Sequence, residues 1–346
     1  MRLSKKKGLA ALALAAAALT ALSGCAGSGS DGGKDAGASG ELQTVNVGIV
    51  QLSIFAPIYV AEAKGYFKDE GIKVNLQNVK SGQDAIPLAS SGKLDVVAAG
   101  FSAGMFNAVN AGLDIKVVAS MGVAGGADEE PASALVVSKK EYDAGTVTTV
   151  ADLKGKKIGV AGGSGGTGAY YVSLALEEAG LTAKDVTFVN LGNPDIPTAL
   201  KTGGVDAGFM SAPFWSNSVD DGTGQKIWQT PEGVSGTGMI YGGQFMTSDL
   251  AQPFFDAVAR GAQDLQGDAK NSDENIKIIA DATGQTPEEV KATPLYNWLP
   301  NLAPLPDQLL GMQKLWLGFG ALDYDKPLAA DDFVTTKFSD AVKTGK

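Results

Sequence analysis

The stretch KKIGVAGGSGGTG at residues 156–168 predicts a β-strand that ends in a glycine-rich turn, and a helix-forming stretch at 169–179 follows it directly. Strand, turn and helix in this order are the unit from which parallel sheets are built. Working outward, strand-like apolar runs recur at 45–50, 74–79, 95–99, 115–120, 134–137, 186–191, 206–210 and 226–229. Helix-forming stretches separate most of these runs, so we expect an α/β protein with parallel sheets.

A faint internal repeat divides this pattern into two parts. Residues 84–95 and 195–206 both contain a short helix, a glycine, two further residues and an aspartate, followed by a strand of small residues. The alternation of strand and helix also restarts after Pro131. Although any α/β chain can contain such a match by chance, the repeat favours two lobes of similar build.

The first residues carry the features of an export signal. A basic start precedes an apolar run at 9–22, which is shorter than the roughly 18–20 residues that span a bilayer. The run ends in Leu-Ser-Gly-Cys at 22–25, which resembles the bacterial lipobox, in which the cysteine is acylated and becomes the mature N-terminus. An ordinary signal peptide with an incidental cysteine is the alternative. We expect residues 1–24 to be a lipoprotein signal peptide and residues 25–43 to be the acylated Cys25 and a flexible tether.

The composition excludes several classes of site. The chain of 346 residues has a net charge of −10, and loss of the basic leader makes it more acidic, which argues against nucleic acid and an anionic membrane surface as partners. There is no histidine, and Cys25 is the only cysteine, so no His/Cys metal site and no Ser-His or Cys-His catalytic pair can form. Arginine occurs only at Arg2 and Arg260, so a bidentate arginine clamp on an anion would have to use Arg260.

The glycine-rich turn is open to three interpretations. Residues 163–168 fit the dinucleotide motif G-x-G-x-x-G, but the next strand ends in Asn190 and Leu191 without the acid that holds the ribose. The same turn fits G-x-S-x-G, the nucleophile elbow of hydrolases, but the histidine base is missing. The third interpretation is an anion cradle of backbone N–H groups and the hydroxyls of Ser164 and Thr167. Either hydroxyl could instead only cap its own helix.

Aromatic side chains follow the predicted carboxyl ends of several strands, the edge at which open α/β sheets bind ligands. They are Phe55, Phe101, Tyr170, Phe214 and Trp215. Packing in the core is the alternative for each of them. Phe214 and Trp215 follow a loop that ends in Pro213 and are the best candidates for an apolar wall of a pocket. Asp195 either caps a helix or binds an ammonium group.

Five stretches resemble the substrate-binding lipoproteins of ABC importers, most closely the taurine, aliphatic-sulfonate and nitrate branch, which shares its fold with thiamine-precursor proteins. They are PIYVA at 57–61, GYF at 65–67, EGIKV at 70–74, LASSGKLD at 88–95 and DLKGKKI at 152–158. The resemblance covers nearly all of the mature chain. It implies a type II periplasmic-binding-protein-like α/β fold, in which two lobes, each a sheet flanked by helices, hold a ligand in the cleft between them. We expect residues 44–132 plus 247–346 to form lobe one and residues 133–246 to form lobe two.

In this family the ligand touches the loop after the first strand, the segment after the second strand and the glycine/serine turn of the second lobe. Carried over, these are Gln51, Ser53 and Phe55, then Ser81 and Gly82, then Ser164, Gly165 and Thr167. Five further residues complete the predicted ligand site: Phe101, Ser102, Asp195, Phe214 and Trp215.

The resemblance implies an extracytoplasmic solute-binding lipoprotein that captures a small anionic organic solute, such as a sulfonate or nitrate, and delivers it to the transmembrane subunits of a permease. We expect a monomer, anchored by lipid to the outer face of the cell membrane, that is not an enzyme and uses no cofactor or metal. Relatives that make the thiamine pyrimidine rely on an active-site histidine, which this chain lacks. The alternatives are an extracellular enzyme of the same fold, a sensory binding protein, or an importer component for a pyrimidine or thiamine precursor.

Overall fold

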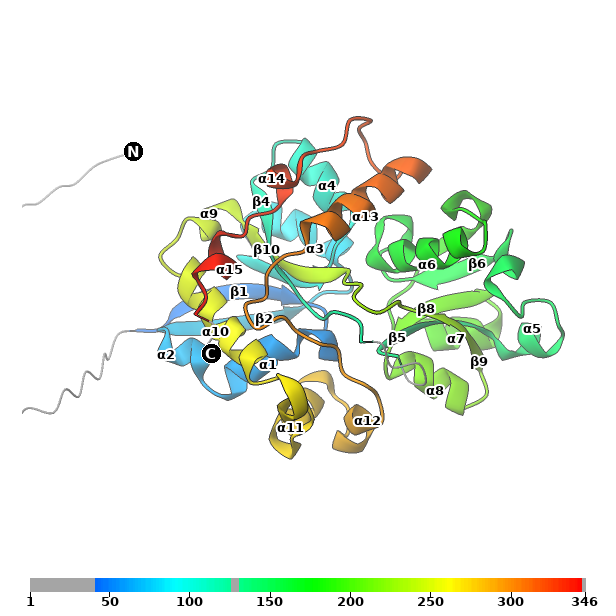
Figure 1. The fold of residues 1–346 in the computed structure, drawn as a ribbon, viewed down its shortest axis with the longest axis horizontal. Helices are drawn as coiled ribbons and strands as arrows, with labels where there is room; N and C mark the ends of the chain where they lie inside the picture. The colour runs from blue at the N-terminus through cyan, green and yellow to red at the C-terminus, as the bar shows by residue number, and fades with distance from the viewer. Residues whose placement is uncertain (1–40, 126–130, 344–346) are drawn as a thin grey trace, which may run out of the picture. The chain divides into compact units, whose positions relative to one another are not determined.

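Two five-stranded sheets, each flanked by helices, organise the residues described by the structure, a computed structural model covering residues 41–125 and 131–343 (Figure 1). We call the residues around them the first and the second lobe. The first sheet has the order β2-β1-β3-β10-β4, with β1 (Gln43–Ile49), β2 (Ile72–Asn78), β3 (Val96–Gly100), β4 (Ile115–Ser120) and β10 (Thr237–Gly242). The second has the order β7-β6-β8-β5-β9, with β5 (Ser133–Ser138), β6 (Lys157–Val160), β7 (Thr187–Asn190), β8 (Ala207–Ser211) and β9 (Gly224–Gln229).

Helices follow most strands, as the alternation predicts. In the first lobe they are α1 (Ala56–Ala63), α2 (Tyr66–Asp69), α3 (Gly82–Ser90), α4 (Ala103–Asn110), α9 (Gly243–Met246), α10 (Ala251–Gln263), α11 (Asp273–Thr283), α12 (Pro287–Lys291), α13 (Pro306–Phe319), α14 (Ala330–Phe333) and α15 (Lys337–Ala341). In the second lobe they are α5 (Lys139–Asp143), α6 (Thr167–Glu178), α7 (Ile196–Thr202) and α8 (Phe214–Asp220). Short 3-10 turns are η1 (Ser53–Phe55), η2 (Val150–Leu153), η3 (Gly163–Gly165), η4 (Ala183–Asp185) and η5 (Gly267–Asn271).

Both sheets are mixed, whereas the sequence pattern predicted parallel sheets. In the first sheet β10 runs antiparallel to β3 and β4. In the second sheet β5 runs antiparallel to β8 and β9. Each of these two strands follows a crossing between the lobes and therefore enters its sheet from the edge at which the parallel strands end. The remaining strand pairs in both sheets are parallel.

The two lobes share one strand order, which confirms the internal repeat. Strands β2-β1-β3-β10-β4 correspond position by position to β7-β6-β8-β5-β9. The repeated aspartate does the same work in both lobes. Asp95, just before β3, accepts a hydrogen bond from the backbone N–H of Asn46 in β1 at 2.8 Å. Asp206, just before β8, accepts one from the N–H of Lys157 in β6 at 2.7 Å.

The chain returns to the first lobe earlier than predicted. The predicted boundary placed residues 133–246 in lobe two, but β10 pairs with β3 and β4 of the first sheet. The return crossing therefore lies in residues 230–236, between β9 and β10. A run such as TGMIYG (237–242) is apolar enough to fill a buried strand in either sheet, so only its pairing partners decide where it belongs.

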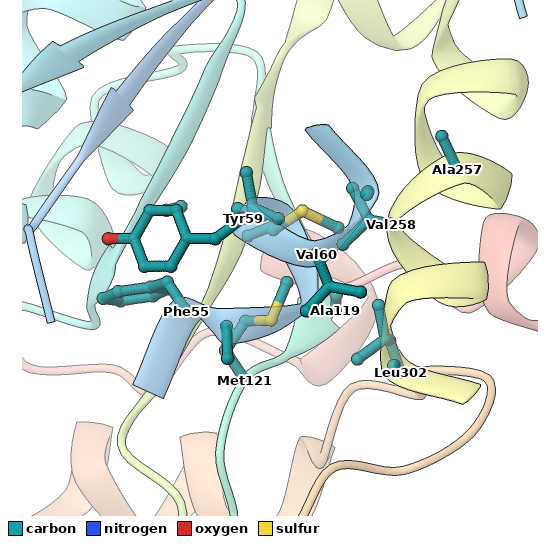
Figure 2. Packing of buried hydrophobic residues seen from close by; sticks show 14 of the residues in the cluster. Phe55, Tyr59, Val60, Ala119, Met121, Ala257, Val258 and Leu302 are labelled. Atoms are coloured by element: carbon teal, nitrogen blue, oxygen red, sulfur yellow. The ribbon is translucent and has the colours of Figure 1, made fainter. Parts of the chain in front are cut away.

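The core of the first lobe lies between its sheet and the pair α1 and α10. All residues of α1 from Ala56 to Ala61 are buried, because the helix is covered by the sheet on one side and by α10 on the other. Figure 2 shows Val60 of α1 beside Val258 of α10, with Phe55, Tyr59 and Leu302 in the same buried cluster. On the other face, α13 contacts α4 of the first lobe and α6 of the second.

The predicted signal peptide, Cys25 and most of the tether lie outside the described residues. Within the residues that the structure does describe, none of the helices combines the length and the apolar character needed to cross a membrane.

Candidate functional site

A cavity lies between the lobes, where the parallel strands of both sheets end. Its volume is about 70 Å³, several times the roughly 10–15 Å³ that one water needs on the same measure, so it has room for a small solute. The first lobe lines it with Val50, Leu52, Ile54, Phe55, Lys80, Ser81, Gly82, Gln83, Gly100, Ser102, Thr237 and Tyr296. The second lobe lines it with Ser133, Ala161, Gly166, Thr167, Gly168, Tyr171, Asn193, Phe209 and Ser211.

Three helix N-termini meet at this cavity. Ser81 is the N-cap of α3 and Ser102 the N-cap of α4, and each side chain accepts a hydrogen bond from a backbone N–H of its first turn at 3.3 Å. The first turn of α6 lines the cavity from the second lobe. The N-terminus of a helix carries roughly half a positive charge and unpaired N–H groups, so three of them together favour an anion.

The N-terminus of α6 has no capping side chain, which corrects one interpretation of the glycine-rich turn. Gly166 occupies the N-cap position, and Thr167 is already the first helical residue. The Thr167 hydroxyl donates instead to the carbonyl oxygen of Phe101 in the first lobe, at 2.7 Å. Neither Thr167 nor Ser164 therefore caps α6. The N–H groups of Ala169 and Tyr170 donate to the carbonyl oxygen of Gly166, which leaves those of Thr167 and Gly168 in the first turn for a ligand.

Among the residues that the structure describes, the charge that lines the cavity has one sign. Within residues 41–125 and 131–343, Lys80 is the only charged residue that lines it, and none of the described carboxylates does so. The Lys80 side chain is exposed and, among the described residues, forms no ion pair. Lys80 also borders a second, more open hollow together with Asp84 and Asp195. It therefore marks the outer end of the cavity and can meet an anionic group there.

Aromatic rings form the apolar walls. Tyr171 of α6 and Phe209 of β8 stack with ring centroids 4.9 Å apart and an angle of 25° between their planes. Phe55 and Tyr296 line the cavity from the first lobe. Burial raises the pKa of Tyr171 and of Tyr296, so both phenols stay neutral at physiological pH.

The lobes approach each other closely beside the Thr167–Phe101 hydrogen bond. A Cβ atom on Gly100 would lie 2.0 Å from Oγ1 and 2.9 Å from Cβ of Thr167. A Cβ atom on Gly236, in the return crossing, would lie 2.5 Å from Cγ2 of Thr167. Both positions accept only glycine while the lobes are this close.

Five of the predicted ligand-binding residues line the cavity: Phe55, Ser81, Gly82, Ser102 and Thr167. Others lie elsewhere. The Gln51 amide donates to the carbonyl oxygen of Ala282 at 2.7 Å, outside the cavity. Ser53 borders a separate small hollow, and Phe101 is buried in the core beneath the site. In the glycine-rich turn, Ser164 is exposed and Gly165 faces Ala103 of the first lobe. Asp195 is exposed and borders only the outer hollow.

The structure does not bring Phe214 and Trp215 to the cavity, so the predicted apolar wall has to be corrected. Trp215 is 5% exposed and belongs to the core of the second lobe, and Phe214 packs against that core. The Trp215 indole N–H donates to the carbonyl oxygen of Pro131 at 2.9 Å. Because α8 packs on β5, β8 and β9, its first aromatic residues turn into the lobe rather than toward the cleft.

Several lining residues were not predicted from the sequence: Lys80, Gln83, Ser133, Tyr171, Asn193, Phe209, Ser211, Thr237 and Tyr296. Some had a signal. Lys80 directly precedes the predicted Ser81, and Ser211 ends a predicted strand at the edge where ligands bind. Tyr296 had none, because it comes from an irregular segment between two helices far along the chain.

Part of the chain is similar in sequence to curated proteins. The chain is 35% identical over 154 residues to the 4-amino-5-hydroxymethyl-2-methylpyrimidine phosphate synthase of Aspergillus parasiticus, an alignment that covers 44% of this chain and 41% of the relative. The chain therefore spans less than half the length of the curated relatives it matches.

Two solved structures share the fold. The alkanesulfonate-binding protein SsuA from Xanthomonas axonopodis pv. citri, bound to MOPS, has a TM-score of 0.66 and 21% identity, with 86% of this chain and 99% of that chain covered. The periplasmic nitrate-binding protein NrtA from Synechocystis PCC 6803 has a TM-score of 0.68 and 15% identity, with 87% and 86% covered. The fold is thus that of periplasmic binding proteins. The family model of NMT1/THI5-like proteins matches residues 53–272, well over half of the sequence, and the chain belongs to this family.

Proposed function

We propose that this protein is the extracytoplasmic solute-binding lipoprotein of an ABC importer and that it captures a small anionic organic solute between its lobes. The observation that carries the proposal is the meeting of three helix N-termini and Lys80 at a cavity that none of the carboxylates described by the structure lines. A buried anion without partners is very costly, and this cavity offers N–H groups, hydroxyls and an ammonium group. The likeness to sulfonate- and nitrate-binding structures supports the same solute class.

The donors are sufficient for an anion without arginine. A hydrogen bond to a charged group contributes roughly 1.5–3 kcal/mol. The first turn of α6 and the hydroxyl of Ser102 lie around one cavity, so two or three such bonds can form to one head group. The Ser81 hydroxyl does not add to them, because it donates to the carboxylate of Asp84 at 2.7 Å. Arg260 does not compete for this role, because its guanidinium pairs with Asp69 at 3.0 Å and lies over the ring of Tyr66.

A binding role is favoured over catalysis. The lining residues described by the structure include no histidine, cysteine, aspartate or glutamate, so none of these side chains is suited to act as a general base at neutral pH. An extracellular enzyme of the same fold, or a sensory binding protein that serves no permease, remains the alternative to a transport role.

Import of a pyrimidine or thiamine precursor is the second candidate. The curated relatives are named for synthesis of a pyrimidine phosphate. The stacked Tyr171–Phe209 pair gives the cavity a flat aromatic wall on which a heterocycle can pack. The phosphate of such a ligand would use the same helix N-termini.

A ligand screen with scattering tests the proposed function. Purified protein is titrated with short alkanesulfonates, nitrate, aromatic acids and 4-amino-5-hydroxymethyl-2-methylpyrimidine, with and without its phosphate. We expect saturable binding of an anionic compound without turnover, a rise in Tm by mass action and a smaller radius of gyration as the lobes close. If only neutral or cationic compounds bind, the anion assignment is wrong. Turnover of the bound compound would establish an enzyme.

Lipid anchoring at Cys25 is part of the proposal, supported by the sequence Leu-Ser-Gly-Cys at 22–25. We expect Cys25→Ala to abolish stable membrane association and to leave the folded body unchanged, because the described body, from residue 41 onward, packs its core without the tether. Fractionation of cells that express either form, with cleavage of the leader checked by mass, measures this. Retention of the processed variant in the membrane fraction would contradict it.

A further inference from the structure

Three hydroxyls gather at the buried end of the cavity, and we call Ser133, Ser211 and Tyr296 the hydroxyl cluster. Ser133 and Ser211 are cross-strand partners at the start of β5 and the end of β8. Tyr296 donates to the carbonyl oxygen of Ala132, the residue directly before Ser133, at 3.3 Å, and all three hydroxyl-bearing residues line the cavity. Ser133 also shares a hydrogen bond of 2.7 Å with Thr230. The cluster therefore already holds its donors and acceptors in fixed positions.

Tyr296 reaches this cluster from a segment that ties several parts of the cleft together, residues 295–308, which we call the C-terminal strap. Asn297 pairs with Val123, which follows β4 where the chain leaves the first lobe, through two backbone hydrogen bonds of 2.7 and 3.0 Å. The Trp298 indole donates to the carbonyl oxygen of Ile54, beside the cavity, at 2.9 Å. Gln308 bonds to the backbone of Gly233 and Ser235 in the return crossing at 2.8 and 2.7 Å. The position of Tyr296 is thus fixed from three directions.

The two ends of the cavity differ in charge. Lys80 is exposed and lies at the outer end, next to the helix N-termini. Tyr296 and Ser133 are 5% and 3% exposed, and no charged residue in the described part of the chain lines the cavity beside them. A charged group buried at the hydroxyl cluster would lack a counter-charge, whereas a neutral hydroxyl, carbonyl or amide could pair with it.

We propose that the hydroxyl cluster is a second polar subsite that recognises an uncharged hydrogen-bonding group on the solute, with Tyr296 as its specificity-determining residue. This rests on the proposed function and narrows the solute to an anion that also carries a neutral polar group. The anionic head lies among the helix N-termini and Lys80, and the neutral group lies against Tyr296. The Tyr171–Phe209 pair packs on the part between them. Tyr296 lies beyond residues 53–272, the part matched by the family model, so this selectivity belongs to the C-terminal strap of this chain.

Matched solutes that differ by one hydroxyl test the subsite. The pairs are ethanesulfonate with 2-hydroxyethanesulfonate and propanoate with 3-hydroxypropanoate, measured by isothermal titration at fixed salt. A hydrogen bond to a neutral group corresponds to a change in affinity of roughly two- to tenfold. We expect wild type to prefer the hydroxylated member of at least one pair by this factor. We expect Tyr296→Phe, which keeps the ring, to reduce the preference to near one, mainly by weakening the hydroxylated member.

Control variants separate this role from a structural one. Ser211→Ala should reduce the same preference while keeping the Tyr296 ring in place, and circular dichroism establishes that each variant is folded. Tyr324→Phe removes another buried hydroxyl, which has no partner among the residues the structure describes and does not line the cavity, and should leave both affinities unchanged. If wild type binds the hydroxylated and plain members equally, or if Tyr296→Phe and Ser211→Ala keep the wild-type preference, the subsite is wrong and the proposed function stands. If wild type binds neither the sulfonates nor the carboxylates, the subsite and the proposed function are both wrong.

Discussion

Gly100→Ala should prevent the two lobes from closing on a solute while leaving each lobe folded. The added Cβ would lie 2.0 Å from Oγ1 and 2.9 Å from Cβ of Thr167, which belongs to the other lobe, and its three nearest atoms are all atoms of Thr167. The overlap therefore exists only while the lobes are closed. Overpacking a tight contact costs roughly 1–3 kcal/mol, so we expect affinity for the identified solute to fall by roughly five- to a hundredfold.

Two measurements distinguish blocked closure from a damaged site. Scattering with saturating solute should show a larger radius of gyration for Gly100→Ala than for wild type. In the background of Thr167→Gly, which removes the opposing side chain, Gly100→Ala should have almost no further effect on affinity. Gly311→Ala is the matched control, because a Cβ there meets nothing within 4 Å. Wild-type affinity and wild-type compaction in Gly100→Ala would show that this contact does not limit closure.

The fold could be predicted to the level of two similar α/β lobes because local signals repeat in both. The aspartates Asp95 and Asp206 follow the same glycine-containing pattern, and each bonds to the first parallel strand of its own sheet. Strand direction and the return crossing could not be predicted in this way. A buried strand such as β10 is apolar on both faces, so its sequence does not record which sheet it joins or which way it runs.

The site could be predicted only where it follows from the order of strand and helix. Ser81 was predicted from the family resemblance, which places the segment after the second strand at the ligand, and Ser102 because it opens a helix directly after a strand, at the ligand edge of the sheet. Tyr171 was missed because it sits one turn beyond the N-terminus of α6, where an aromatic residue is equally at home in a core. Tyr296 was missed because long-range contacts of the C-terminal strap alone bring it to the cleft.

Trp215 shows how a residue of the right type at the right edge can still belong to the core, and its truncation should have a large effect on stability. The side chain is 5% exposed, packs in a cluster with Ile196, Leu200 and Met210, and donates its N–H to Pro131. Replacement of a buried tryptophan by alanine typically costs about 3–5 kcal/mol, which corresponds to a fall in Tm of roughly 10 °C for a protein of this size.

We therefore expect Trp215→Ala to lower Tm and the free energy of unfolding strongly, while the protein that is still folded binds its solute with nearly wild-type affinity. Phe209→Leu is the contrasting variant, because Phe209 lines the cavity and stacks on Tyr171. It retains an apolar side chain in the core and should lose affinity with a smaller loss of stability. Urea denaturation and titration well below the transition measure the two quantities separately. If Trp215→Ala keeps wild-type stability and loses binding, Trp215 contacts the solute directly, as the sequence predicted, because only direct contact produces that combination.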